Sequence, residues 1–398
     1  MSIDKRWLAI LLEKQKSGAA GGTGNIYGVS WDLSTTNRLT RTDAAADFPA
    51  PSPSVDGSNG SSPFDNIWPW SGMQKVVDEN AGVFVSIPKY YYRIQHTGEA
   101  LNIQITDKAT SGFSVSPAHA DRGDGKGERD VVYIARYKCA GEMGASIPDA
   151  LPVVNMTRAQ FRATVNEAAG APYHLQDYAM FWTVRLLMLV EFATWDFQGA
   201  IGYGCGNGES AENTGSTDNM PYHTGTISES AETYAVGIQY RYIEDMWANV
   251  VEFIDGWRCE DAGNDDGSLN VYITLNPAEY SDTEGGVLVS NIPSTANGGM
   301  IKDWAVPSVK GYSWALCPAA IAGEDELTDG NEYVADVCGF DGPALGSGGY
   351  CGEPGPVFGP CSLVGSVAEG SGPFAGARHQ KIPRGGLGVA TPSSMVQP

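Results

Sequence analysis

The chain has 398 residues, of which 42% are hydrophobic, 18% are charged and 50 are glycines, a composition typical of a globular protein with much irregular structure. Its formal net charge of −22 excludes nucleic acid and anionic membranes as main partners, because both repel a strongly acidic surface. No apolar run approaches the roughly 20 residues of a membrane helix, so no membrane insertion is predicted.

The first 110 residues predict a small β-rich domain. Residues 4–16 place apolar side chains at helical spacing, which indicates a short helix that either caps this domain or joins copies into a homo-oligomer. Strands are expected at 26–31 and 83–88, with a loop rich in Pro, Ser and Gly at 48–62. The apolar stretch 7–12 is too short for a signal peptide, so we expect synthesis in the cytoplasm and release by lysis.

Residues 111–398 predict an α+β domain in which two helices are followed by many short strands. Its boundary falls in the polar, Gly-rich stretch 109–130, where we interpret Arg122-Gly123-Asp124 as a solvated loop. A strand is expected at 131–137, and short strands separated by turns fill 234–340.

Two helices are predicted between these strands. Thr157 and Gln160 form a capping box for a helix at 158–169. Asp177 can cap a longer helix from 178 to about 198, whose apolar stripe we assign to the core.

Nothing in the sequence argues for catalysis. The five histidines are scattered, and the chain has no His-Glu-x-x-His, Gly-x-Ser-x-Gly, Gly-x-Gly-x-x-Gly or Walker sequence. The seven cysteines stand singly, which favours reduced thiols over a zinc site or a disulfide framework. We therefore predict no cofactor and no metal. A calcium loop at 261–266 stays open as an alternative, because oxygen ligands suffice for that ion.

The segment 242–257, YIEDMWANVVEFIDGW, is the most informative part of the chain. It resembles the signature of the formylglycine-generating-enzyme group within the C-type-lectin fold, and the matching residues are Asp245, Met246, Asn249, Val250 and Glu252. We interpret the motif as structural. Asp245 and Asn249 are suited to hydrogen-bond turn backbone, and the side chains expected to fill the core are Met246, Trp247 and Phe253. The resemblance implies a C-type-lectin-like domain over 111–398.

The C-terminal block 341–378 is similar to the variable region of proteins diversified by retroelements. Such regions begin with Gly-Gly, here Gly348-Gly349, and close with Gly-Ala-Arg, here Gly376-Ala377-Arg378; the leucine that usually follows is His379. Mutagenesis of template adenines in asparagine codons cannot produce Lys, Met, Trp, Gln or Glu. Residues 341–376 contain none of the first four and two glutamates. The composition therefore agrees with the resemblance.

The N-terminal region carries a third resemblance. Residues 27–32, 39–44, 64–73 and 87–92 look like the opening of tail proteins from phages and prophages. This resemblance implies that residues 1–110 attach the protein to the virion.

Together these resemblances imply a receptor-binding protein of a phage tail, located in the virion. Its expected partners are a bacterial surface protein or glycan and other phage tail proteins. Large or polar side chains of the variable block are expected to contact the ligand. They are Tyr350, Glu353, Val357, Phe358, Ser362, Val364, Ser366, Glu369, Ser371 and Phe374.

Two alternatives remain open from the sequence. Enzymes of the formylglycine-generating type oxidise a substrate cysteine with two closely spaced cysteines that bind copper, and Cys351 and Cys361 lie in the corresponding block, ten residues apart. The other alternative is a structural tail protein that binds no receptor.

Overall fold

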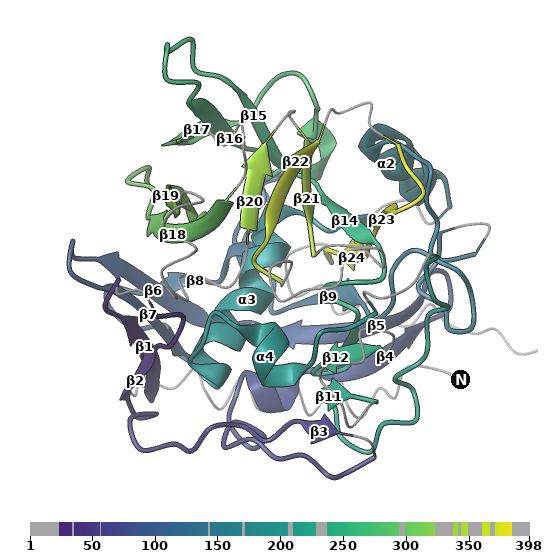
Figure 1. The fold of residues 1–398 in the computed structure, drawn as a ribbon, viewed down its shortest axis with the longest axis horizontal. Helices are drawn as coiled ribbons and strands as arrows, with labels where there is room; N and C mark the ends of the chain where they lie inside the picture. Colours follow the sequence, from purple (N-terminus) through teal and green to yellow (C-terminus); the bar gives the residue numbers. More distant parts are fainter. Residues whose placement is uncertain are drawn as a thin grey trace, which may run out of the picture.

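A computed structural model of the protein describes residues 24–33, 36–55, 57–141, 144–168, 172–205, 210–227, 237–293, 299–322, 337–340, 344–348, 360–366 and 371–383. The helix expected at 4–16 lies outside these residues. Within them the protein has five β-sheets and three α-helices, a β-rich α+β fold (Figure 1).

Both predicted helices form, and both begin at the predicted caps. Helix α2 is Arg158–Ala168; the backbone N–H of Thr157 donates to Gln160 Oε1 at 2.8 Å, and the N–H of Gln160 donates to Thr157 Oγ1 at 3.2 Å. Helix α3 is Tyr178–Phe192, and the Asp177 carboxylate accepts the N–H at its third position at 2.8 Å.

Helix α3 ends six residues before the predicted position near residue 198. Ala193 adopts a left-handed conformation with φ 53°, and a separate short helix, α4 (Phe197–Ile201), follows. The cause is tertiary, because the carbonyl of Ala193 accepts the backbone N–H of Leu39 at 2.9 Å and the N–H of Trp195 donates to Asn37 O at 2.8 Å. Docking onto the N-terminal region therefore stops the helix.

Replacing Ala193 with glycine should stabilise the protein by about 0.5–1 kcal/mol. A left-handed conformation costs an L-residue about 1–2 kcal/mol, and the gain is partly offset by the greater freedom of glycine in the unfolded chain. Urea unfolding measures the change. Ala163, exposed within α2, is the matched control, since Ala163→Gly should destabilise by about 1 kcal/mol. Equal losses in both variants would contradict this account.

The strands form five sheets. The first sheet has, in spatial order, the strands β2 (Thr40–Asp43), β1 (Ile26–Trp31), β7 (Leu101–Thr106), β6 (Tyr91–His96) and β8 (Ser114–Val115). The second has β10 (Tyr173–Leu175), β24 (His379–Lys381), β9 (Val131–Ala135), β5 (Gly82–Pro88) and β4 (Gln74–Asp78). The third sheet has β13 (Ile243–Glu244), β12 (Ile238–Tyr240), β11 (Gly225–Thr226) and β3 (Ser54–Val55). The fourth has β19 (Cys317–Ala322), β18 (Gly299–Ala305), β20 (Val337–Phe340), β22 (Leu363–Ser366), β21 (Ala344–Ser347), β14 (Val251–Ile254) and β23 (Ala375–Ala377). The fifth has β15 (Trp257–Asp261), β16 (Leu269–Ile273) and β17 (Val287–Ile292). The strands expected at 26–31 and 83–88 are confirmed, and the one expected at 131–137 is two residues shorter.

The boundary expected at residue 110 does not separate two hydrophobic cores. Strand β5, from the N-terminal part, pairs antiparallel with β9, and β3 pairs parallel with β11. One cluster of buried side chains takes residues from both sides of the boundary, from Tyr27 to Leu363. Residues 24–110 are therefore part of the same packed unit as the rest of the described chain.

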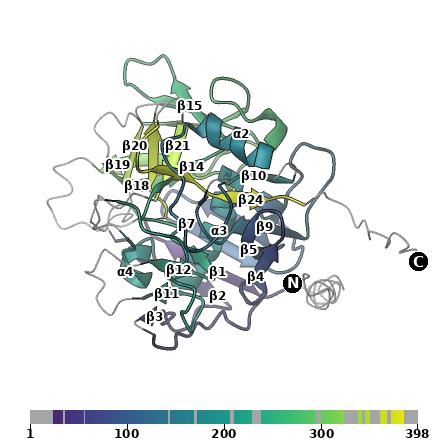
Figure 2. The same ribbon diagram turned by 90° about the vertical axis from the view of Figure 1, so that its right-hand side faces the viewer.

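Helix α3 lies at the centre of this unit. All of its side chains are buried, including the charged Arg185 and Glu191. Figure 1 shows it between the strands around β1 and the strands β20–β22, and the turned view in Figure 2 agrees. The predicted assignment of its apolar stripe to the core is confirmed, but the burial extends around the whole helix.

Candidate functional site

The segment Tyr242–Trp257 forms the base of the candidate site. Asp245 Oδ1 accepts a backbone N–H of β12 at 3.2 Å, and the Asn249 amide bonds both the N–H and the C=O of Glu212, at 3.0 and 3.1 Å. The structural interpretation of this segment is confirmed. Its apolar side chains that are at most 3% exposed include Met246, Trp247 and Phe253.

A buried cluster of charges joins this segment to the C-terminal Gly-Ala-Arg sequence. Glu252 Oε1 accepts Lys138 Nζ at 2.8 Å and Arg378 Nη2 at 2.6 Å, and all three side chains are buried. Burial alone would raise the pKa of Glu252, but the two cations hold it below its usual value. A Cβ at Gly376 would lie 2.6 Å from Val250 Cγ2, so any other residue there would force Val250 to move. The Gly-Ala-Arg end of the C-terminal block 341–378 is therefore part of the framework.

Gly348 and Pro360, which flank residues 349–359, are both held to the core by hydrogen bonds. The N–H of Gly348 donates to Ser362 Oγ at 2.9 Å, and Ser347 Oγ donates to the carbonyl of Pro360 at 3.5 Å. The same carbonyl accepts Nε of Arg185, a buried side chain of α3. These contacts hold Ser347 and Pro360 next to each other, beside Arg185 of helix α3.

Gly348 is a position where only glycine fits. Its φ is 93°, and a Cβ there would lie 2.9 Å from the carbonyl oxygen of Met246. The Gly348-Gly349 sequence thus has a backbone role at its first residue.

The structure places half of the ten predicted contact residues. Ser371 is exposed and Phe374 is half-buried, while Val364 and Ser366 belong to β22. Ser362 is fully buried, which corrects its prediction as a surface contact: its hydroxyl accepts the N–H of Gly348 inside the framework. The other five lie outside the described residues and are Tyr350, Glu353, Val357, Phe358 and Glu369.

The candidates for cysteine or calcium chemistry were Cys351, Cys361 and the acidic turn 261–266. Cys361 is fully buried ahead of β22, and Cys351 lies outside the described residues. At the tip between β15 and β16, Asp261 and Asp266 accept the N–H groups of Gly263 and Ser268 at 2.7 and 2.9 Å, as in ordinary turns. In the described part of the chain, no three His, Cys, Asp or Glu side chains are grouped to hold a metal ion.

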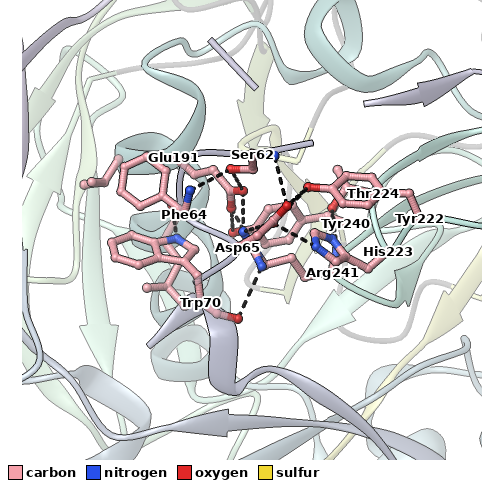
Figure 3. A network of polar contacts seen from close by, with 12 residues as sticks. Ser62, Phe64, Asp65, Trp70, Glu191, Tyr222, His223, Thr224, Tyr240 and Arg241 are labelled. Atoms are coloured by element: carbon pink, nitrogen blue, oxygen red, sulfur yellow. Dashed lines mark hydrogen bonds and ion pairs between the residues drawn. The ribbon is translucent and has the colours of Figure 1, made fainter. Parts of the chain in front are cut away.

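A second polar cluster, which the sequence did not predict, lies beside α3 (Figure 3). Arg241 donates from Nε to Glu191 Oε2 at 2.8 Å and from Nη2 to Glu191 Oε1 at 2.6 Å. Ser62 Oγ and Tyr240 OH donate to the same carboxylate at 2.7 and 2.9 Å. Glu191 and Arg241 are almost fully buried, so this ion pair is shielded from water.

Asp65 forms the outer half of this cluster. Its carboxylate accepts Tyr222 OH at 2.8 Å and Arg241 Nη2 at 3.2 Å, and its Oδ1 lies 3.0 Å from His223 Nε2. Burial raises the pKa of Asp65, but hydrogen bonds from His223 and Tyr222 outweigh it and hold the value at about 2.

The Asp65 carboxylate is thus held ionised by internal donors, which does not suit it for donating a proton to a substrate. The cluster joins residues 62–70 to α3 and to the β12 region. The only sign of this cluster in the sequence is a pair of charged residues, Arg185 and Glu191, inside the apolar helix 178–192. The other partners cannot be recognised because they are distant in the chain: Arg241 is 50 positions from Glu191 and 176 from Asp65.

No protein-family model matches the chain, and no curated protein shows significant similarity to it.

Proposed function

We propose that the protein is the receptor-binding protein of a bacteriophage tail. In this proposal it binds a bacterial surface protein or glycan through side chains between Gly348 and Arg378. The observation that carries the proposal is that the residues flanking 349–359 are held to the core, by the Gly348–Ser362 hydrogen bond and by the two bonds to the carbonyl of Pro360.

A rigid base is what a variable binding surface requires. Side chains that are replaced from one variant to the next must not contribute to the core, since a core substitution typically costs about 2–5 kcal/mol. Here the core positions belong to the flanks: Ala344, Leu345, Leu363 and Ala377 are all fully buried. In this proposal the exchangeable positions lie within 349–359, and framework residues such as Gly348, Cys361 and Ser362 stay constant.

The proposal includes a C-type-lectin-like fold. Its support is the order of the elements, two helices α2 and α3 followed by the strands β11–β24, and the buried signature segment with its bonds at Asp245 and Asn249. The same proposal includes attachment to other tail proteins through the N-terminal region, assembly into a homo-oligomer and a location in the virion. None of the helices in the described ranges has the length and apolar character that a membrane crossing requires.

Scrambling the order of residues 350–358 should abolish binding to bacterial cells. The variant keeps Gly348, Gly349 and Pro360, so its melting temperature should stay within a few degrees of the parent protein. Binding of labelled protein to a panel of bacterial strains, measured by flow cytometry, reports the effect. We expect a decrease of at least about tenfold in apparent affinity, since the anchoring side chains would be rearranged.

The control is a scramble of residues 107–112, a turn between β7 and β8 with exposed positions. It should leave binding unchanged. If the parent protein binds a strain and the 350–358 scramble binds it equally well, the proposed surface is wrong. If neither binds any strain, while both assemble into particles, the protein is a structural tail component.

A further inference from the structure

The sheet β15–β16–β17 has an outer edge on β17. Its register with β16 runs from Val287 opposite Ile273 to Ile292 opposite Leu269, and among the described strands only β16 pairs with it. Figure 1 shows β17 as the outermost strand of this sheet, at the upper left. An edge of this kind presents backbone N–H and C=O groups that another extended chain can bond.

Strand β17 has exposed apolar side chains at one end and buried side chains that fix it to the core. Val287 and Leu288 are 41% and 48% exposed, and because they are consecutive in the strand their side chains lie on opposite faces of the sheet. Val289 and Ile292 are buried in the core and hold the strand in place. Strand β17 therefore has one exposed apolar side chain on each face beside its open backbone edge.

Leu288 also extends a row of side chains across the sheet. It lies opposite Tyr272, which lies opposite Arg258, and the Arg258 guanidinium stands 4.2 Å from the centre of the Tyr272 ring. A partner at this edge would contact Leu288, and the Tyr272 ring lies next to Leu288 on the inner side.

The charge around the edge is strongly negative. Residues 257–292 contain seven acidic side chains and one basic one, a net charge of −6 out of −22 for the chain. Arg258 is bonded to Glu260 at 2.5 Å, and Asp282 is bonded to Arg162 at 2.9 Å. The acidic side chains exposed near the two ends of β17 are Asp261, Asp265, Asp266, Glu279 and Glu284.

We infer that the outer edge of β17 binds an extended basic segment of another protein as an added strand. The backbone supplies hydrogen bonds, Leu288 and Val287 supply apolar contact, and the acidic side chains at both ends of the strand select lysine and arginine. A second copy of this chain is a poorer occupant, because edge-to-edge pairing would bring together two sheets that each carry −6. The inference is independent of the receptor-binding proposal, since β17 lies outside residues 341–378.

A short alternating peptide, Lys-Val repeated four times with blocked ends and a fluorescent label, is a suitable probe. Fluorescence anisotropy with the full chain should show saturable binding that weakens when salt is raised from about 0.05 to 0.5 M. The Leu288→Lys variant should bind at least about tenfold more weakly, since it removes the apolar contact and adds a repelling charge. The matching Glu-Val peptide should not bind.

Val77→Lys is the matched control. Val77 is 56% exposed on β4, the edge strand of a different sheet, so its replacement makes the same change at an unrelated edge. Binding that is weakened equally by both variants, or binding of the Glu-Val peptide, would overturn the inference. So would a concentration-dependent dimer in sedimentation that Leu288→Lys dissociates, because the edge would then join copies of this chain. Circular dichroism of each variant verifies that the fold is retained.

Discussion

Replacing Arg378 with methionine should lower the free energy of unfolding by about 3–5 kcal/mol, the largest loss we expect from any single substitution in the C-terminal block. Arg378 is fully buried and makes six hydrogen bonds. Two go to Glu252 Oε1, at 2.6 and 2.9 Å, and four go to the backbone carbonyls of residues 135, 136, 244 and 245.

The size of this loss follows from what the substitution leaves behind. Four carbonyls and one carboxylate lose a donor in a site without access to water, and a buried group left unpaired costs about 1–3 kcal/mol. Lys138 still pairs with Glu252, which limits the cost for the carboxylate. Arg378→Lys should recover part of the loss, because the ammonium keeps the charge but has only three donors.

Urea unfolding followed by tryptophan fluorescence measures these differences. Arg38, exposed next to β2, is the matched control: Arg38→Met should change stability by no more than about 0.5 kcal/mol. A loss below about 1 kcal/mol for Arg378→Met would show that the C-terminal Gly-Ala-Arg sequence is not part of the framework.

His379→Leu should stabilise the protein by about 1–3 kcal/mol. His379 is 2% exposed, and within the described residues neither ring nitrogen has a hydrogen-bond partner. Its neighbour across the sheet is Leu175, a core residue. Leucine has a similar size and no polar atoms to bury.

The same substitution should change how stability depends on pH. Burial lowers the pKa of His379 from 6.5 to about 4, so the unfolded chain binds a proton that the folded protein does not. The folded state therefore loses stability as the pH falls from about 6.5 towards 4, and His379→Leu should flatten part of this decline. Burial also lowers the pKa of His119, to about 3, and that of His174, so these two side chains keep a part of the decline.

Unfolding curves at pH 7, 6, 5 and 4 for the parent and the variant test this prediction, with the gap between them widening towards acid. His96→Leu is the control, because His96 lies on an exposed strand end and bonds to Asp303 at 3.1 Å. The buried-histidine account is wrong if His379→Leu lowers stability at pH 7, or if the gap is the same at every pH.

Several local features follow from the sequence alone. The caps at Thr157 and Asp177, the strands at 26–31 and 83–88 and the buried signature near Trp247 are all determined by residues a few positions apart. A cap is a hydrogen bond across three residues, and a strand or helix shows its buried face in its own periodicity. Such features need no knowledge of distant chain segments.

Other features were decided only by the tertiary structure. Arg122, interpreted as part of a solvated loop, is fully buried and paired with Asp177, 55 positions away. Ser362 became a framework residue because its hydroxyl meets Gly348, and α3 ended at Phe192 because Leu39 bonds the next carbonyl. A boundary near residue 110 was expected from composition, yet β5 and β9 share a sheet across it. In each case the deciding partner is distant in the chain, and hydrogen bonding and burial depend on proximity in space, which periodicity and composition do not encode.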